Sequence, residues 1–406
     1  MAILDAAGLC ARDFAAHAPY LRALPMASVS PLKEILETHR VVVCVGSGGV
    51  GKTTTAASLA LWAAMHGRRV LCLTIDPARR LATSLGLKEM TTDERVVDAA
   101  VLTARGLEMK GSLAAMMLDG KRTFDDLVRR YASSPARAQR ILDNRLYQYI
   151  SGSLAGTQEY MAMEKLHAVR SDPRYDLIVL DTPPTSNALD FLDAPERLAG
   201  LVDSPTMQWI VTAFETSGSM SFNLVGRGAK MVLQGISKLT GAGFLEQVAS
   251  FLTEFNDLFG GFRKRSEEVG AALRSPEVAF VIVTSPAPLA IEEAVFFADR
   301  LGAAGMNRDA LVVNQVHRVL PEVKATTSAL EAEARPHLSG LDAGKIVGRV
   351  RRAYEDAKVR AEADRIQIDK LKKRVDASLP LLEVPVFDHD VHDLDALEAV
   401  GRTLVG

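Results

Sequence analysis

Short apolar segments recur along this chain of 406 residues, and longer segments with a helical pattern lie between them. Each apolar segment is rich in Val, Ile and Leu and is nearly continuous, without the alternation of a half-exposed strand. Such segments are typical of strands that are covered on both faces in a mostly parallel sheet. We therefore expect a doubly wound α/β fold with strands at residues 41–45, 70–75, 177–180, 279–283, 311–313 and 381–386.

Two long segments interrupt this pattern and are predicted to be helical insertions that form one subdomain. A further charge-rich helix is expected at about 352–377, lying along the domain with one side in solvent. The predicted organisation is an N-terminal extension (1–35), a sheet-forming core (36–104, 173–195 and 276–406) and a helical subdomain (105–172 and 196–275).

The bulk composition excludes several classes of protein. The formal net charge is −2, so no overall positive field favours a nucleic-acid partner. Three cysteines are too few for a disulfide framework, and without a C-x-x-C pair a thiolate zinc site is not expected. No apolar run approaches the roughly 20 residues that span a bilayer, and the start of the chain does not read as a secretory signal. A cytoplasmic location without a direct membrane span is therefore expected.

The segment GSGGVGKT, residues 46–53, matches the pattern G-x-x-x-x-G-K-[ST] between an apolar strand and an Ala-rich helix. We call it the phosphate loop. Its glycines allow backbone N–H groups to surround phosphate oxygens at a helix N-terminus. Lys52 is expected to bridge the β- and γ-phosphates, and the Thr53 hydroxyl to bind Mg²⁺. The predicted nucleotide-binding residues here are Gly46, Ser47, Gly48, Gly49, Val50, Gly51, Lys52, Thr53 and Thr54.

A nucleotide hydrolase also needs carboxylates at the carboxyl ends of neighbouring strands, to hold the metal and to orient water. Asp181 ends the strand in YDLIVLDTPP and is predicted to be a direct Mg²⁺ ligand or a hydrogen-bond partner of one. Asp76 ends the strand in VLCLTIDPARR, where Pro77 breaks the strand. An Asp-Pro pair at this place is also ordinary turn chemistry, so a structural role for Asp76 stays open.

Three segments together resemble a known family. GSGGVGKTT (46–54), TIDPARRL (74–81) and DTPPTSNALDFLDAP (181–195) are similar, in order and spacing, to the phosphate loop, first switch and second switch of the ArsA-type ATPases. That family includes an arsenite-pump ATPase and an ATPase that delivers tail-anchored membrane proteins. This chain resembles a bacterial-like member with a single copy of the unit. The resemblance implies an Mg²⁺-dependent, dimeric P-loop ATPase whose helical subdomain moves with the nucleotide state.

The resemblance also implies roles for individual residues. Asp76 takes the part of the catalytic aspartate that positions water, and Asp181 lies on the metal side. Asn314 and Gln315 in LVVNQV match a pair that reads the adenine edge, which amide groups are suited to do. By weaker alignment, the loop after the last strand completes the adenine pocket with Pro385, Val386 and Phe387.

Ser47 departs from the family pattern, because the family carries there a lysine that reaches the partner's phosphates. Such a cation supplied from a second subunit raises phosphoryl transfer by about 10³–10⁵-fold, and serine cannot replace it. Three explanations are open: a lysine-bearing paralogue provides the cation, an arginine of the first switch such as Arg79 or Arg80 substitutes, or the protein hydrolyses ATP slowly and works as a nucleotide-gated binder. The first is favoured, because it explains why Lys52, Thr53, Asp76 and Asp181 are kept. Further departures are Ala287, in place of a Glu, and the missing C-x-x-C.

Two functions compete on the sequence alone. The favoured one is a cytosolic ATPase that captures and releases an apolar or membrane-protein client. Nine of the 13 methionines lie between Met90 and Met231, as a groove for varied apolar partners would require, although methionine is also a common gap-filler in helical cores. An aromatic stripe from Phe244 to Phe262 leaves the same choice open. The alternative is the energising subunit of an oxyanion pump, but clustered thiolates for arsenite are missing.

Overall fold

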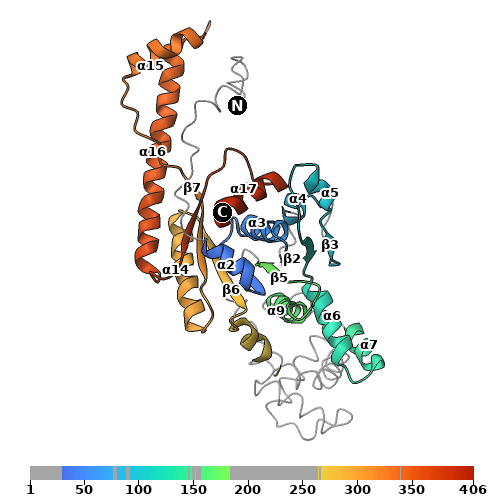
Figure 1. The fold of residues 1–406 in the computed structure, drawn as a ribbon. Helices are drawn as coiled ribbons and strands as arrows, with labels where there is room; N and C mark the ends of the chain where they lie inside the picture. The colour runs from blue at the N-terminus through green and yellow to red at the C-terminus, as the bar shows by residue number, and fades with distance from the viewer. Residues whose placement is uncertain are drawn as a thin grey trace, which may run out of the picture.

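Eight strands form one sheet in the part of the chain that the computed structural model describes, which is residues 30–75, 80–87, 92–144, 147–148, 151, 157–182, 264, 267–338 and 340–406. The strand order is β3-β4-β2-β5-β1-β6-β7-β8 (Figure 1). Six of the neighbouring pairs are parallel, and the β3–β4 pair at one edge is antiparallel. The strands are β1 (Val41–Val45), β2 (Arg69–Thr74), β3 (Arg95–Val96), β4 (Ser112–Met117), β5 (Leu177–Asp181), β6 (Val278–Thr284), β7 (Ala310–Val316) and β8 (Leu381–Pro385).

Helices cover both faces of this sheet, as the continuous apolar strands require. One face is packed by α2 (Pro31–Thr38), α3 (Lys52–Met65) and α17 (Leu394–Val405). The other face is packed by α9 (Thr157–Arg170), α14 (Pro288–Ala303) and part of α16 (Ala343–Arg374). Successive residues of β1 alternate between the two cores, with Val42 and Cys44 in the first and Val41 and Val43 in the second. The predicted doubly wound α/β fold is confirmed.

The sequence analysis was wrong about the start of the first insertion. Residues 112–117 lie inside the segment predicted to be helical, yet they form β4 and pair with β2 in parallel register from Arg69↔Ser112 to Thr74↔Met117. The segment SLAAMM is rich in Ala and Met, which favour helices locally. The segment forms a strand instead, because it pairs with β2 and because its middle four residues are buried in the sheet. The sheet-forming core therefore extends past residue 104.

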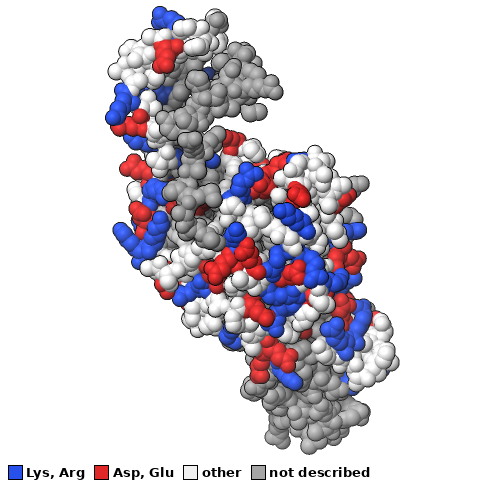
Figure 2. Space-filling view, viewed as in Figure 1, with Lys and Arg blue, Asp and Glu red and all other residues white. Residues whose placement is uncertain are grey.

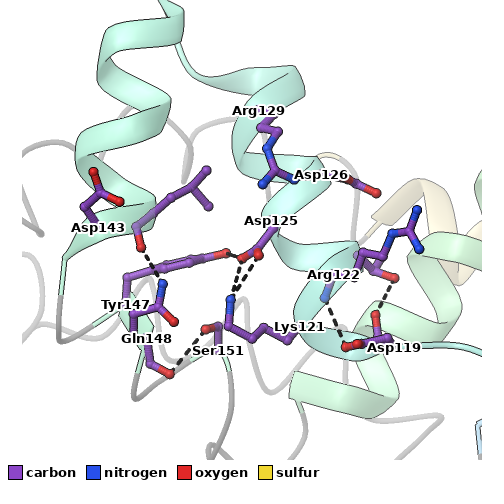
Figure 3. A network of polar contacts seen from close by, with 12 residues as sticks. Asp119, Lys121, Arg122, Asp125, Asp126, Arg129, Asp143, Tyr147, Gln148 and Ser151 are labelled. Atoms are coloured by element: carbon purple, nitrogen blue, oxygen red, sulfur yellow. Dashed lines mark hydrogen bonds and ion pairs between the residues drawn. The ribbon is translucent and has the colours of Figure 1, made fainter. Parts of the chain in front are cut away.

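The remaining part of the first insertion is helical where it is described. The chain forms α6 (Gly120–Tyr131) and α7 (Pro135–Asp143) before α9. The hydroxyl of Tyr147, which follows α7, donates to Asp125 Oδ1 of α6 at 2.6 Å, and within α6 Lys121 Nζ donates to Asp125 Oδ2 at 2.9 Å (Figure 3). Tyr147 is fully buried, and this burial raises the pKa of its hydroxyl. Residues 183–263, with the Phe244–Phe262 stripe, lie outside the described residues.

The predicted boundary of the N-terminal extension at residue 35 also changes. Helix α2 begins at Pro31, and its residues Leu32, Ile35 and Leu36 are buried in the same core as α17. Just before α2, the hydroxyl of Ser30 donates to the carbonyl of Leu404 at 2.6 Å. Residues 31–35 therefore belong with the sheet-forming core, because their apolar side chains complete it.

The charge-rich helix predicted at 352–377 is longer than expected. As α16 it covers 32 residues from Ala343, and the side chain of Asp342 caps it by accepting from Lys345 N. Its first half projects beyond the sheet together with α15 (Thr327–Ala334) and the short helix η3 (Arg335–His337) (Figure 1). On the face shown in Figure 2, acidic and basic side chains are interspersed over the described elements. Among the described helices, none has the length and apolarity needed to cross a membrane.

Candidate functional site

The phosphate loop, residues 46–53, runs between β1 and α3 and is packed closely against two neighbouring strands. Gly46 and Gly51 have positive φ angles, of 152° and 91°. A Cβ atom on Gly46 would lie 2.0 Å from the carbonyl oxygen of Val283 in β6, and one on Gly51 would lie 2.2 Å from Asn314 Nδ2 in β7. No side chain fits at either place, so the two glycines of the motif are needed for the loop to sit against β6 and β7.

Lys52 is the first residue of α3, and its side chain turns back over the loop. Its Nζ donates to the carbonyl of Ser47 at 2.6 Å, and the side chain is almost buried. The ammonium group is thereby held against the backbone of the phosphate loop, at the N-terminus of α3. This arrangement places positive charge where phosphate oxygens would lie.

Asp181 is brought against Thr53 by the sheet, although 128 residues separate them in sequence. Its Oδ2 accepts from Thr53 Oγ1 at 2.8 Å and from Thr74 Oγ1 at 3.0 Å, and the residue is fully buried. Thr74, Asp181 and Cys44 are register partners across β2, β5 and β1. Burial, with Asp181 nearby, raises the pKa of the Cys44 thiol well above its usual value, so this thiol stays neutral.

The residues at this place suit magnesium. Mg²⁺ prefers oxygen ligands and in phosphate sites is bound by one or two protein groups together with phosphate oxygens. A hydroxyl on Thr53 and a carboxylate on Asp181, in direct contact at the end of the phosphate loop, provide such a set. Within the described ranges no cluster of three or more His, Cys, Asp or Glu residues could hold a metal by itself. An ion here would therefore depend on the phosphates of a nucleotide.

Asn314 and Gln315 lie at the end of β7, where Asn314 contacts the phosphate loop. Asn314 Nδ2 donates to the carbonyl of Val50 at 2.9 Å, which ties β7 to the phosphate loop. Gln315 is exposed and has a φ of 61°, which makes it the sole non-glycine residue with positive φ in the described part of the chain. The pairing of β7 with β8 shifts register between Val313 and Val316, so the two amide residues form an irregular strand end.

One cavity of about 830 Å³ joins the phosphate loop to these residues. It opens at the carboxyl ends of the parallel strands, where α/β proteins bind their ligands. Pro385, Val386 and Phe387 line it as the sequence analysis expected them to. Sequence reasoning missed several other lining residues: Thr83, Ser84, Thr182, His389, Asp390, Val391, His392 and Val400. The polar segment 388–393 directly after the expected adenine loop was the signal that could have pointed to part of them.

The remaining predicted site residues either make no side-chain hydrogen bond among the described residues or lie outside them. Ser47 is only 8% exposed, and its hydroxyl oxygen has no hydrogen-bond partner among the described residues. Asp76 and Arg79 lie outside the described residues, so their roles stay predictions. Ala287 is the residue before Pro288 at the start of α14 and makes no side-chain cap to that helix.

Comparison with known proteins places the chain in a family. The sequence model of the anion-transporting ATPases (ArsA ATPases) matches residues 39–362. The protein ATPase GET3 of Phaeosphaeria nodorum is 26% identical over 292 residues, which is 70% of this chain and 79% of that protein. ATPase get3 of Aspergillus terreus is 32% identical over 163 residues, 40% of this chain and 45% of that relative, and ATPase get3 of Aspergillus niger is 31% identical over the same length and shares. The chain thus spans less than half of these two relatives. Because the family match covers the whole phosphate site and most of the sheet, the chain belongs to the ArsA family of anion-transporting ATPases.

Proposed function

We propose that this chain binds MgATP in the 830 Å³ cavity and hydrolyses it to drive a change of conformation. The observation that carries the proposal is the cavity itself, which is lined by residues of the phosphate loop together with Gln315 and Phe387. Its volume lies within the range of roughly 300–1,000 Å³ that is usual for ligand sites. Family membership supports an ATPase, and the grouping of the loop glycines, Lys52, Thr53 and Asp181 supports phosphoryl transfer as its reaction.

Each residue has a defined part in this proposal. Lys52 binds the β- and γ-phosphates, and Thr53 with Asp181 would hold Mg²⁺, which supplies positive charge to the phosphate oxygens when it is bound. Asp76 orients the attacking water. Gln315 contacts the adenine edge, while Asn314 keeps β7 against the phosphate loop through Val50.

Isothermal titration calorimetry of the purified chain tests the proposal directly. MgATP should bind with a one-to-one stoichiometry per chain and a Kd within the range of about 1 μM to 1 mM that is usual for enzyme substrates. ATP with EDTA should bind more weakly, because the metal contribution is lost. A chain that gives no heat with MgATP, and no displacement of a fluorescent ATP analogue, would contradict the proposal.

The proposed working unit is a dimer, either of two copies of this chain or with a lysine-bearing paralogue. Its support is the family resemblance together with Ser47, a buried hydroxyl at the position where the family carries the trans cation. Ser47→Lys should raise turnover if a homodimer forms, since a trans cation is worth about 10³–10⁵-fold. Ser47→Ala is the matched control: it changes the same side chain without adding a cation, so the rise in turnover expected of Ser47→Lys should be absent. An unchanged rate in Ser47→Lys, with MgATP still bound, would reject the homodimer arrangement.

The proposed client is an apolar segment of a membrane protein. The resemblance to the ATPases of tail-anchored protein delivery supports this, and so does the similarity to proteins named ATPase GET3. Met116, Met161 and Met163 are buried in the protein interior, so these methionines do not form an exposed apolar groove. A labelled transmembrane peptide should co-sediment with the chain in a manner that depends on the nucleotide; equal binding with ATP, ADP and no nucleotide would count against this part of the proposal.

The printed description of the family, anion transport, favours a second candidate, the energising subunit of an oxyanion pump. The two described cysteines, Cys44 and Cys72, are buried in strands and have raised pKa values, so they do not form a soft-metalloid site. Stimulation of ATP turnover by an oxyanion would favour the pump over the client-binding function.

A further inference from the structure

Gln315 lines the cavity and has an unusual backbone conformation. Its φ of 61° lies in the left-handed region. This conformation costs free energy for any residue that has a Cβ atom, and it persists only where the surrounding structure imposes it. The register shift between Val313 and Val316 leaves the residue out of the regular ladder with β8. Something besides strand pairing must therefore fix the conformation of Gln315.

Contacts on both sides of Gln315 supply this constraint. On the N-terminal side, Asn314 is bonded to the carbonyl of Val50. On the C-terminal side, Oδ2 of Asp364 accepts a hydrogen bond from the backbone N–H of His317 at 2.7 Å. The same oxygen lies 2.9 Å from Nδ1 of the His317 ring. The side chain of Asp364 is 13% exposed and that of His317 is 36% exposed, so the two contacts are partly buried.

Arg365, which follows Asp364 in α16, forms an ion pair with the neighbouring strand β8. Arg365 forms a two-pronged ion pair with Glu383 of β8, with distances of 2.9 and 2.8 Å. Glu383 is the register partner of Val313, and β8 leads directly into the loop with Phe387. Two successive residues of α16 are thus joined to β8 and to the residue that directly follows β7.

We propose that Asp364 is a positioning residue for recognition of the nucleotide base. By holding His317, it fixes the preceding residues so that Gln315 keeps its left-handed conformation and presents its amide to the adenine edge. An amide has one acceptor and two donor hydrogens, so its orientation decides whether it complements adenine or guanine. The inference rests on the proposed function, because it names what sets the base preference of that same site.

The test compares three ligands on matched variants of the whole chain. Calorimetry in the presence of Mg²⁺ would measure ATP, GTP and inorganic triphosphate, which has the phosphates without the base. Asp364→Ala should raise the Kd for ATP by about tenfold, since it removes two hydrogen bonds to a charged group. The Kd for GTP should change less, so the preference for ATP over GTP should decrease. Binding of inorganic triphosphate should stay within about twofold, because the phosphate loop is untouched.

Two further variants sharpen the outcome. Asp369→Ala removes an exposed aspartate from the same helix and should change none of the three affinities. Asp364→Asn keeps an oxygen that accepts from the His317 N–H, so it should recover most of the ATP preference and also serves if Asp364→Ala does not fold. An unchanged ATP-to-GTP ratio in both Asp364 variants, or an equal loss for all three ligands, would overturn the inference while ATP binding by the unmodified chain still supports the proposed function. Failure of the unmodified chain to bind ATP would overturn both.

Discussion

Lys52→Ala should lower kcat/KM for ATP by about 10²–10³-fold, the usual cost of removing one preorganised charge from a transition state. Lys52 is 5% exposed, and its Nζ donates to the carbonyl of Ser47 in the phosphate loop at 2.6 Å. No other described lysine lines the cavity, so no neighbouring ammonium group replaces the lost charge there. Steady-state phosphate release at several ATP concentrations measures the effect.

The matched control is Lys345→Ala, which removes an exposed lysine from α16 and should leave kcat/KM unchanged. Thermal unfolding of both variants should be followed in parallel, since a large loss of stability in Lys52→Ala would mean that the lysine mainly supports the fold of the loop. Turnover within a factor of two of the unmodified chain would show that Lys52 does not contact the transferred phosphate.

Asp181→Asn should remove most of the effect of Mg²⁺ on nucleotide binding and reduce turnover by about 10²-fold or more. The substitution keeps an oxygen that accepts from Thr53 and Thr74, so the local hydrogen bonds survive while the negative charge is lost. ATP affinity in EDTA should therefore change little, and the gain in affinity on adding Mg²⁺ should shrink. Calorimetry at a series of free Mg²⁺ concentrations gives both quantities.

Asp176→Asn is a suitable control because Asp176 precedes the same strand, β5, at its opposite end. Hydrogen bonds from Arg69 hold the pKa of Asp176 at about 2, so this carboxylate is charged at neutral pH and joins β5 to β2. Its neutralisation should lower the free energy of unfolding but leave the Mg²⁺ dependence of ATP binding intact. If both variants lose the Mg²⁺ dependence equally, the effect belongs to the sheet and Asp181 has no specific part.

The local pattern of the sequence determined much of this protein. Residues 41–45 and the phosphate loop after them were predicted closely, because a buried strand and a loop of glycines are defined by neighbours in sequence. The strand ending at Asp181 was likewise predicted from its apolar run. The family resemblance was enough to single out Phe387, which lines the same cavity as the phosphate loop, while its part in binding adenine stays a prediction.

Only the tertiary structure decided the features that depend on distant partners. The segment SLAAMM became β4 because β2 offered it a parallel ladder, which its own helix propensity could not reveal. The contact of Thr53 with Asp181 joins residues 128 positions apart, and that of Asn314 with Val50 joins residues 264 apart. Periodicity and motif spacing carry information about near neighbours along the chain, whereas the direction of a side chain at the end of a strand is set by whichever element packs beside it. For that reason the sequence indicated the individual candidate residues, and the fold alone brought them around one cavity.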